Sequence, residues 1–130
     1  MAGERAQFLV STEWLAEHLS APDLVVVDGS WYLPHMERDP KAEYDQVHIP
    51  GARFFDIDEI SDQRSDLPHM APPVEKFMSR MRAMGIGDGH QVVVYDTVGL
   101  FSAPRVWWTF RLMGKTDVAV LDGGLPKWVA

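Results

Sequence analysis

Residues 91–96 read Gln-Val-Val-Val-Tyr-Asp, and residues 103–111 read Ala-Pro-Arg-Val-Trp-Trp-Thr-Phe-Arg. The first stretch predicts a buried β-strand because it is a continuous apolar run rich in β-branched residues. The second predicts an α-helix, since Pro104 falls in the first turn, where its missing N–H costs little. The loop between them, 96–102, follows the carboxyl end of the strand, where α/β proteins place their chemistry.

Strand and helix signals alternate along the rest of the chain. Further strands are expected at 8–10, 24–29, 52–56 and 118–123. Further helices are expected at 11–19, at 40–44 as a single turn, at 73–84 and beyond 125, and 57–71 is expected to be a loop. This alternation predicts an α/β fold with a five-stranded parallel sheet flanked by helices on both faces.

The helix that follows Pro73 has its apolar residues in the i, i+3, i+4, i+7, i+10 pattern of a core-facing stripe. These residues are Val74, Phe77, Met78, Met81 and Met84. Gly85 follows in the position that ends a helix. We therefore expect the whole stripe to pack in the core.

The composition narrows the class of protein. At 130 residues, with five Trp and six Phe, the chain is expected to fold as a single domain, 1–130. A net charge of −7 argues against a nucleic-acid surface, and no apolar run approaches the roughly 20 residues that span a bilayer. The chain starts without the apolar core of a signal peptide, so a cytoplasmic location is expected. No cysteine is present, which excludes thiolate metal sites and cysteine catalysis, and neither a metal nor a cofactor is expected.

Several motifs fall in order over nearly the whole chain. They are Val27–Pro34, His48–Ala52, Phe54–Asp58, Leu67–Met70, Val94–Asp96, Ser102–Trp108, and Leu121–Gly124 with Trp128. With these motifs the chain resembles the amino-terminal rhodanese domain of two-domain 3-mercaptopyruvate and thiosulfate sulfurtransferases. The run Ser30–Pro34 resembles the mercaptopyruvate branch of this family more than the thiosulfate branch.

The resemblance implies a rhodanese-like fold and a division of labour between two domains. The partner would be a carboxyl-terminal catalytic rhodanese domain, whose cysteine takes sulfane sulfur from a small-molecule donor and passes it to a thiol or cyanide. Asp96 stands at the place of that cysteine in this chain. Its hard oxygen is a poor carrier of sulfane sulfur, so the chain alone is expected to be inactive. Two roles remain open for Asp96, which are capping the loop and shaping a ligand cleft.

Asp39 and His48 are the candidate catalytic residues, in supporting roles only. The resemblance implies that this Asp and the His of the His-Ile-Pro-Gly motif assist the cysteine across an interdomain cleft. A histidine can move protons near neutral pH, and a carboxylate can fix its tautomer. The alternative is that His48 caps a turn before Pro50 and that Asp39 is a solvated loop charge.

Three further residues of the helix at 103–111 are open to more than one interpretation. Trp107 and Trp108 are adjacent, so they point in different directions, and one is expected in the core while the other contacts a neighbouring domain. Arg105 faces either an anion at the loop or a local ion pair with Asp96 or Glu75.

Two functions are compatible with these observations. The first is the non-catalytic domain of a sulfurtransferase, and the chain would then be a fragment of a two-domain protein. The alternative is a stand-alone, inactive rhodanese-like module that binds a protein partner.

Overall fold

A computed structural model describes residues 8–33, 36–62, 71–87, 89–99 and 101–130. It confirms the predicted five-stranded sheet, in the order β1-β5-β4-β2-β3 with every pair parallel. The strands are β1 (Leu9–Val10), β2 (Leu24–Asp28), β3 (Arg53–Phe54), β4 (Gln91–Tyr95) and β5 (Val118–Leu121).

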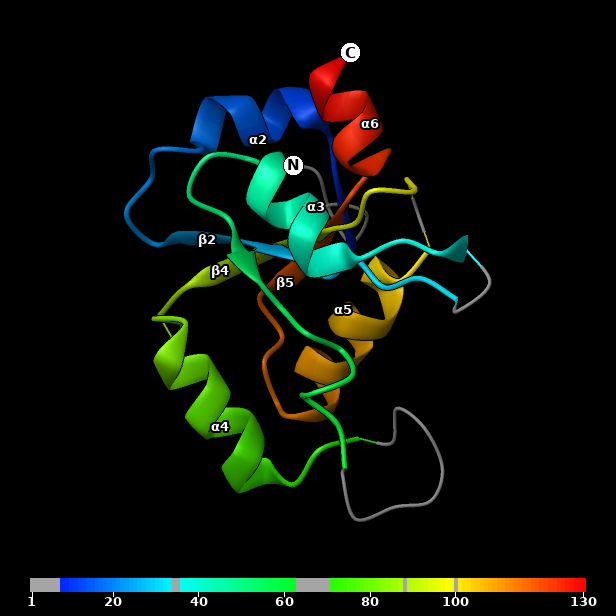
Figure 1. Cartoon of the computed structure of the whole chain (residues 1–130). Coiled ribbons are helices and arrows are strands. Elements are labelled where there is room, and N and C mark those ends of the chain that lie inside the picture. Colours follow the sequence, from blue (N-terminus) through cyan, green and yellow to red (C-terminus); the bar gives the residue numbers. More distant parts are fainter. Residues whose placement is uncertain (1–7, 34–35, 63–70, 88, 100) are drawn as a thin grey trace.

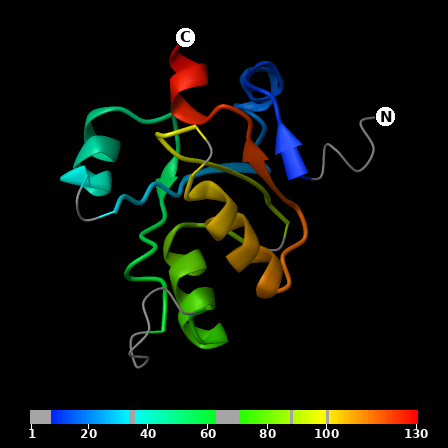
Figure 2. The same ribbon diagram turned by 90° about the vertical axis from the view of Figure 1, so that its right-hand side faces the viewer.

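Helices cover both faces of this sheet (Figures 1 and 2). They are α2 (Thr12–His18), α3 (Pro40–Gln46), α4 (Val74–Ala83), α5 (Ala103–Leu112) and α6 (Gly124–Val129). Successive side chains of β4 point to opposite faces, as the pleat of a strand requires. Val92 and Val94 belong to the core cluster that includes residues of α4 and α5, whereas Val93 and Tyr95 belong to the cluster on the α2 side.

The structure corrects three local predictions. The expected turn at 40–44 is a seven-residue helix that runs to Gln46. The expected strand at 52–56 forms ladder pairs only at Arg53–Phe54, on the edge of the sheet. In α4, Phe77 and Met81 are buried as predicted, but Val74 and Met78 are 55% and 52% exposed. The helix packs through only part of its apolar stripe, so its outer row stays open.

Some predicted features fall wholly or partly on positions that are not described. Outside the described residues lie Pro34 of the run Ser30–Pro34, residues 63–70 of the expected loop at 57–71 together with the motif Leu67–Met70, and residue 100 of the loop at 96–102. Within the described part of the chain, no helix combines the length and the apolar character that crossing a bilayer would require.

Candidate functional site

The loop between β4 and α5 closes around one buried carboxylate. Asp96 is 1% exposed and accepts five backbone hydrogen bonds. Its Oδ1 accepts from the N–H groups of Val98 and Gly99 at 3.0 and 2.8 Å. Its Oδ2 accepts from three further N–H groups at 2.8, 2.9 and 2.8 Å, and they belong to Phe101, Ser102 and Ala103.

This carboxylate also caps α5. The N-cap residue, Ser102, makes no side-chain cap hydrogen bond, and the N–H of Ala103 in the first turn points at Asp96 instead. A helix start and converging N–H groups form the kind of cradle that binds an anion. Because the side chain of Asp96 already accepts from these five N–H groups, none of the five is open to a second anion. Of the two open roles, the geometry favours capping.

The side chain of Ser102 does not cap α5 and instead joins this loop to the segment that follows β2. Its hydroxyl donates to Gly29 O at 2.7 Å and accepts from Trp31 N at 3.0 Å. A second link runs from Thr97 N to Ser30 Oγ at 3.1 Å. The loops after β2 and β4 are therefore held together at the carboxyl edge of the sheet.

A second carboxylate, Asp28, is fully buried at the end of β2. Its Oδ1 accepts from Ser30 N at 2.9 Å, whereas its Oδ2 makes no hydrogen bond to any described residue. Burial raises the pKa of Asp28, since the ionised form is poorly solvated there. Burial, and next the neighbouring Asp28 carboxylate, raise the pKa of Tyr95.

A polar cluster at the rim connects the loop to α3. The Tyr32 hydroxyl donates to Glu43 Oε1 at 2.8 Å and is also hydrogen-bonded to Thr97 Oγ1. Arg38 binds both carboxylate oxygens of Glu43, at 2.7 and 2.9 Å. This pairing lowers the pKa of Glu43, and burial raises the pKa of Tyr32 to about 12. The cluster borders a cavity of about 500 Å³ that Leu125 of α6 also lines.

Asp39 and His48 lie at opposite ends of α3 and do not contact each other. Asp39 is the N-cap of the helix, and its Oδ1 accepts from Ala42 N at 3.1 Å. His48 is exposed, lies 2.7 Å from Tyr44 O through Nδ1, and stacks on the Tyr44 ring at 4.3 Å. A carbonyl oxygen accepts only, so Nδ1 carries the proton and Nε2 is the basic nitrogen. The backbone, not Asp39, fixes this tautomer, and a role for either residue in catalysis stays a prediction.

The geometry of His48 has a close parallel elsewhere in the chain. His18, at the end of α2, lies 2.7 Å from Trp14 O through Nδ1 and stacks on the Trp14 ring at 4.1 Å. The same local arrangement thus occurs in a histidine to which the sequence gives no functional role. Within the described ranges, no group of three or more His, Asp or Glu side chains is arranged to hold a metal ion.

Trp107 and Trp108 of α5 differ in exposure, as their adjacent positions on the helix predict. Trp107 is partly buried and donates from Nε1 to Val118 O at 3.1 Å, whereas Trp108 is 43% exposed. Arg105 forms no ion pair with Asp96 or Glu75, and its guanidinium lies 5.0 Å from the centre of the Trp108 ring. Partial burial lowers the pKa of Arg105. The predicted local ion pair is therefore wrong, because backbone N–H groups already occupy Asp96.

Sequence reasoning missed the buried Asp28 and the rim cluster. The position of Asp28 could have been recognised from the sequence, because this carboxylate ends an apolar strand as Asp96 does. The contacts of Tyr32 with Glu43 and Thr97 join segments that are distant in sequence, and no spacing rule shows them.

The parallel sheet and the helices on both of its faces define an α/β protein. At the carboxyl end of β4, a strand-to-helix loop gathers N–H groups of the kind that bind an anion, and the carboxylate of Asp96 fills this cradle from within. The family model described as "Rhodanese-like domain" matches residues 11–130. The chain belongs to this family.

The chain matches only part of the length of each of the following relatives. It is 52% identical over 122 residues to thiosulfate/3-mercaptopyruvate sulfurtransferase 1, mitochondrial, of Arabidopsis thaliana, covering 94% of this chain and 32% of that protein. It is 49% identical over 127 residues to human 3-mercaptopyruvate sulfurtransferase, covering 93% and 43%. A crystal structure of a 3-mercaptopyruvate sulfotransferase from Escherichia coli superposes with a TM-score of 0.89 at 44% identity, covering 94% of this chain and 47% of that one. The chain is homologous to the amino-terminal region of such enzymes and spans less than half their length.

Proposed function

We propose that this chain is the non-catalytic rhodanese domain of a sulfurtransferase that moves sulfane sulfur from 3-mercaptopyruvate, or thiosulfate, to a thiol or cyanide. One observation carries the proposal, which is that the Asp96 carboxylate occupies the cradle where a sulfur carrier needs open N–H groups. The named activities of its relatives support the choice of donor.

The domain then acts by docking on a catalytic rhodanese domain that supplies the cysteine. Exposed apolar side chains on the loop and on α5 provide a surface for this contact, because apolar and aromatic residues are enriched in the buried centre of interfaces. Val98, Phe101 and Trp108 are 45%, 42% and 43% exposed.

Turnover tests this proposal in two steps. The purified chain, given 3-mercaptopyruvate and cyanide, is expected to form no thiocyanate and to show no covalent sulfur adduct by mass spectrometry. The same chain, added to a separately purified cysteine-bearing rhodanese domain of a related sulfurtransferase, is expected to bind it and raise its turnover. Sulfur transfer by the chain alone would overturn the proposal.

A pair of matched variants locates the contact. Phe101→Glu places a charge beside the loop and is expected to abolish the effect on the catalytic domain. Leu112→Glu places the same charge on a 52% exposed residue at the far end of α5 and is expected to leave the effect intact. If the chain binds no catalytic domain, the alternative of a stand-alone binding module is favoured.

A further inference from the structure

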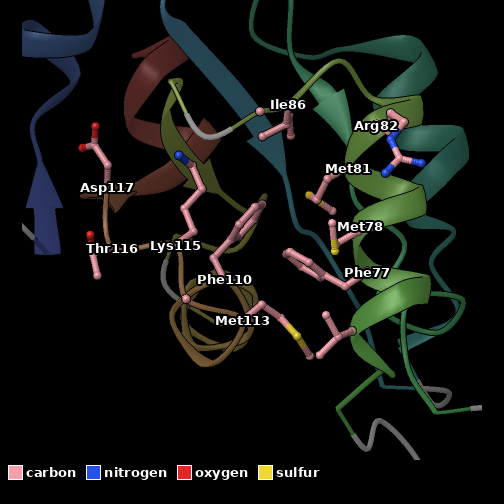
Figure 3. Close-up of a pocket in the computed structure, with 13 residues that line it drawn as sticks. Phe77, Met78, Met81, Arg82, Ile86, Phe110, Met113, Lys115, Thr116 and Asp117 are labelled. Atoms are coloured by element: carbon pink, nitrogen blue, oxygen red, sulfur yellow. The ribbon is translucent and has the colours of Figure 1, made fainter.

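A groove of about 690 Å³ lies between α4 and the segment that leads from the end of α5 into β5 (Figure 3). Ile86 and Gly87 line it just before β4, and Thr116 and Asp117 line it just before β5. The groove therefore lies at the amino-terminal edge of the sheet, away from the Asp96 loop at the carboxyl edge. The site described above does not use it.

The groove has a rigid apolar floor and an open apolar wall. Phe77, Met81 and Phe110 line it and are at most 6% exposed, so the floor is part of the core. Val74 and Met78 line the wall and are about half exposed. Large apolar side chains that stay exposed beside a cavity are typical of a binding surface.

A positive charge lies in line with this wall. Val74, Met78 and Arg82 follow one another at intervals of four residues, so they form one row along α4. The neighbouring cations Lys76 and Arg80 are paired with Glu59, whereas Arg82 forms no ion pair with a described residue.

Other charges border the same space. Figure 3 shows Lys115 across the groove from the α4 side chains, with Thr116 and Asp117 beyond it on the side away from α4. In a chain with a net charge of −7, an anion binds only where a nearby cation offsets the repulsion of the whole molecule, and Arg82 is such a cation on α4. The α4 row thus combines an apolar stretch with a cationic end.

We propose that this groove binds a small amphipathic anion, a medium-chain carboxylate, with its tail along Val74 and Met78 and its head at Arg82. The row from Val74 to Arg82 spans roughly 12 Å, at 1.5 Å per helical residue. The volume falls within the usual range of small-molecule sites. The apolar row ends at Arg82, an exposed charge that also lines the groove, and this suits a tail with a charged head better than a long partner helix.

Decanoate is the probe for the test, with decanol as its neutral counterpart. In protein labelled with ¹³C at the methionine methyl groups, decanoate is expected to shift the signals of Met78, Met81 and Met113 saturably. Met36, which does not line the groove, is expected to stay unchanged. Decanol is expected to bind more weakly than decanoate.

Two charge variants separate a specific head-group contact from overall charge. Arg82→Gln is expected to weaken decanoate binding roughly fivefold, as the loss of an exposed charge pair would, and to leave decanol binding unchanged. Lys41→Gln removes one positive charge from α3, outside the groove, and is expected to change neither affinity.

Three results would overturn the proposal. The first is the absence of saturable shifts at the groove methionines, and the second is equal binding of decanol and decanoate. The third is concentration-dependent self-association in sedimentation that Met78→Glu abolishes, because a second copy of the chain would then occupy the groove.

Discussion

The carboxylate of Asp96 caps helix α5, seven residues further along the chain, by accepting the N–H of Ala103 at 2.8 Å. The same carboxylate holds four other N–H groups of the loop, so one side chain organises the whole strand-to-helix connection. In this chain the loop is thus stabilised by a side chain of its own, at the position where the sequence resemblance predicts the counterpart of a nucleophile. Its conformation does not require a bound substrate anion.

Replacing Asp96 with Ala is therefore expected to lower the free energy of unfolding by roughly 3 kcal/mol or more, because several buried N–H groups lose their acceptor. Asp96→Asn is expected to be nearly as harmful, since an amide has one oxygen and turns N–H donors toward the other N–H groups. Urea unfolding measures both. Asp122→Ala removes an exposed carboxylate just after β5 and is expected to change stability little, so an equal loss there would contradict the assignment.

Replacing Asp96 with Cys tests whether the cradle is still of the type that stabilises a thiolate. The N–H groups and the start of α5 are expected to lower the pKa of the new thiol below its ordinary value of about 8.5. The rate of alkylation by iodoacetamide as a function of pH measures this pKa. Asp122→Cys gives an exposed thiol for comparison, and identical pH profiles for the two variants would show that the loop has no such field.

Asp28 is expected to make stability depend on pH. Its pKa is raised in the fold, so the unfolded chain ionises first as pH increases, and the stability that Asp28 contributes below its unfolded pKa is lost as pH rises through its folded pKa. Asp28→Asn keeps an acceptor for Ser30 N and cannot ionise. The stability of this variant minus that of the unmodified chain, measured by thermal unfolding at each pH, is expected to be larger at about pH 7 than at about pH 4. An equal difference at the two pH values would show that burial does not disfavour ionisation of Asp28.

Gly124 marks the point where α6 approaches the loop. A Cβ at this position would lie 2.4 Å from Asp96 O and 3.0 Å from Gly99 Cα, at a φ of +59°. Gly124→Ala is expected to destabilise the fold by about 2 kcal/mol, because backbone atoms on both sides cannot move aside easily. Gly85, with a φ of +77° and nothing within 4 Å of the added Cβ, provides the control for backbone strain alone. A smaller loss for Gly124→Ala than for Gly85→Ala would contradict the close contact.

The sequence predicts the parallel sheet well because its central strands are continuous runs of apolar, β-branched residues. Val92, Val93 and Val94 are all fully buried, as expected for a strand covered on both faces. The pattern misleads in α4, where Met78 has the spacing of a core residue but lies on the groove wall. Periodicity shows which residues share a helix face, and the position of the neighbouring helix decides how much of that face is covered.

The candidate site is predictable in position but not in its contacts. The place of Asp96 after β4 follows from the strand pattern, whereas its five N–H partners depend on the turn that the loop makes. The resemblance pairs Asp39 with His48, yet α3 is a complete helix that keeps them at its two ends. The single domain, the cytoplasmic location and the supporting catalytic roles of these two residues stay predictions.

His48 and His18 allow the catalytic role to be separated from the local one. Both donate from Nδ1 to a backbone carbonyl four residues earlier and stack on an aromatic ring, so His48→Ala and His18→Ala are expected to cost similar, small amounts of stability. In the complex with a catalytic domain, only His48→Ala is expected to lower turnover, by roughly tenfold or more, because general acid–base groups contribute at least that much. Turnover measured against pH completes the comparison, because loss of a general acid–base group changes the pH profile of the reaction. If both variants retain full turnover across pH, the basic Nε2 of His48 has no part in the reaction, and its position at the end of α3 is a matter of helix capping alone.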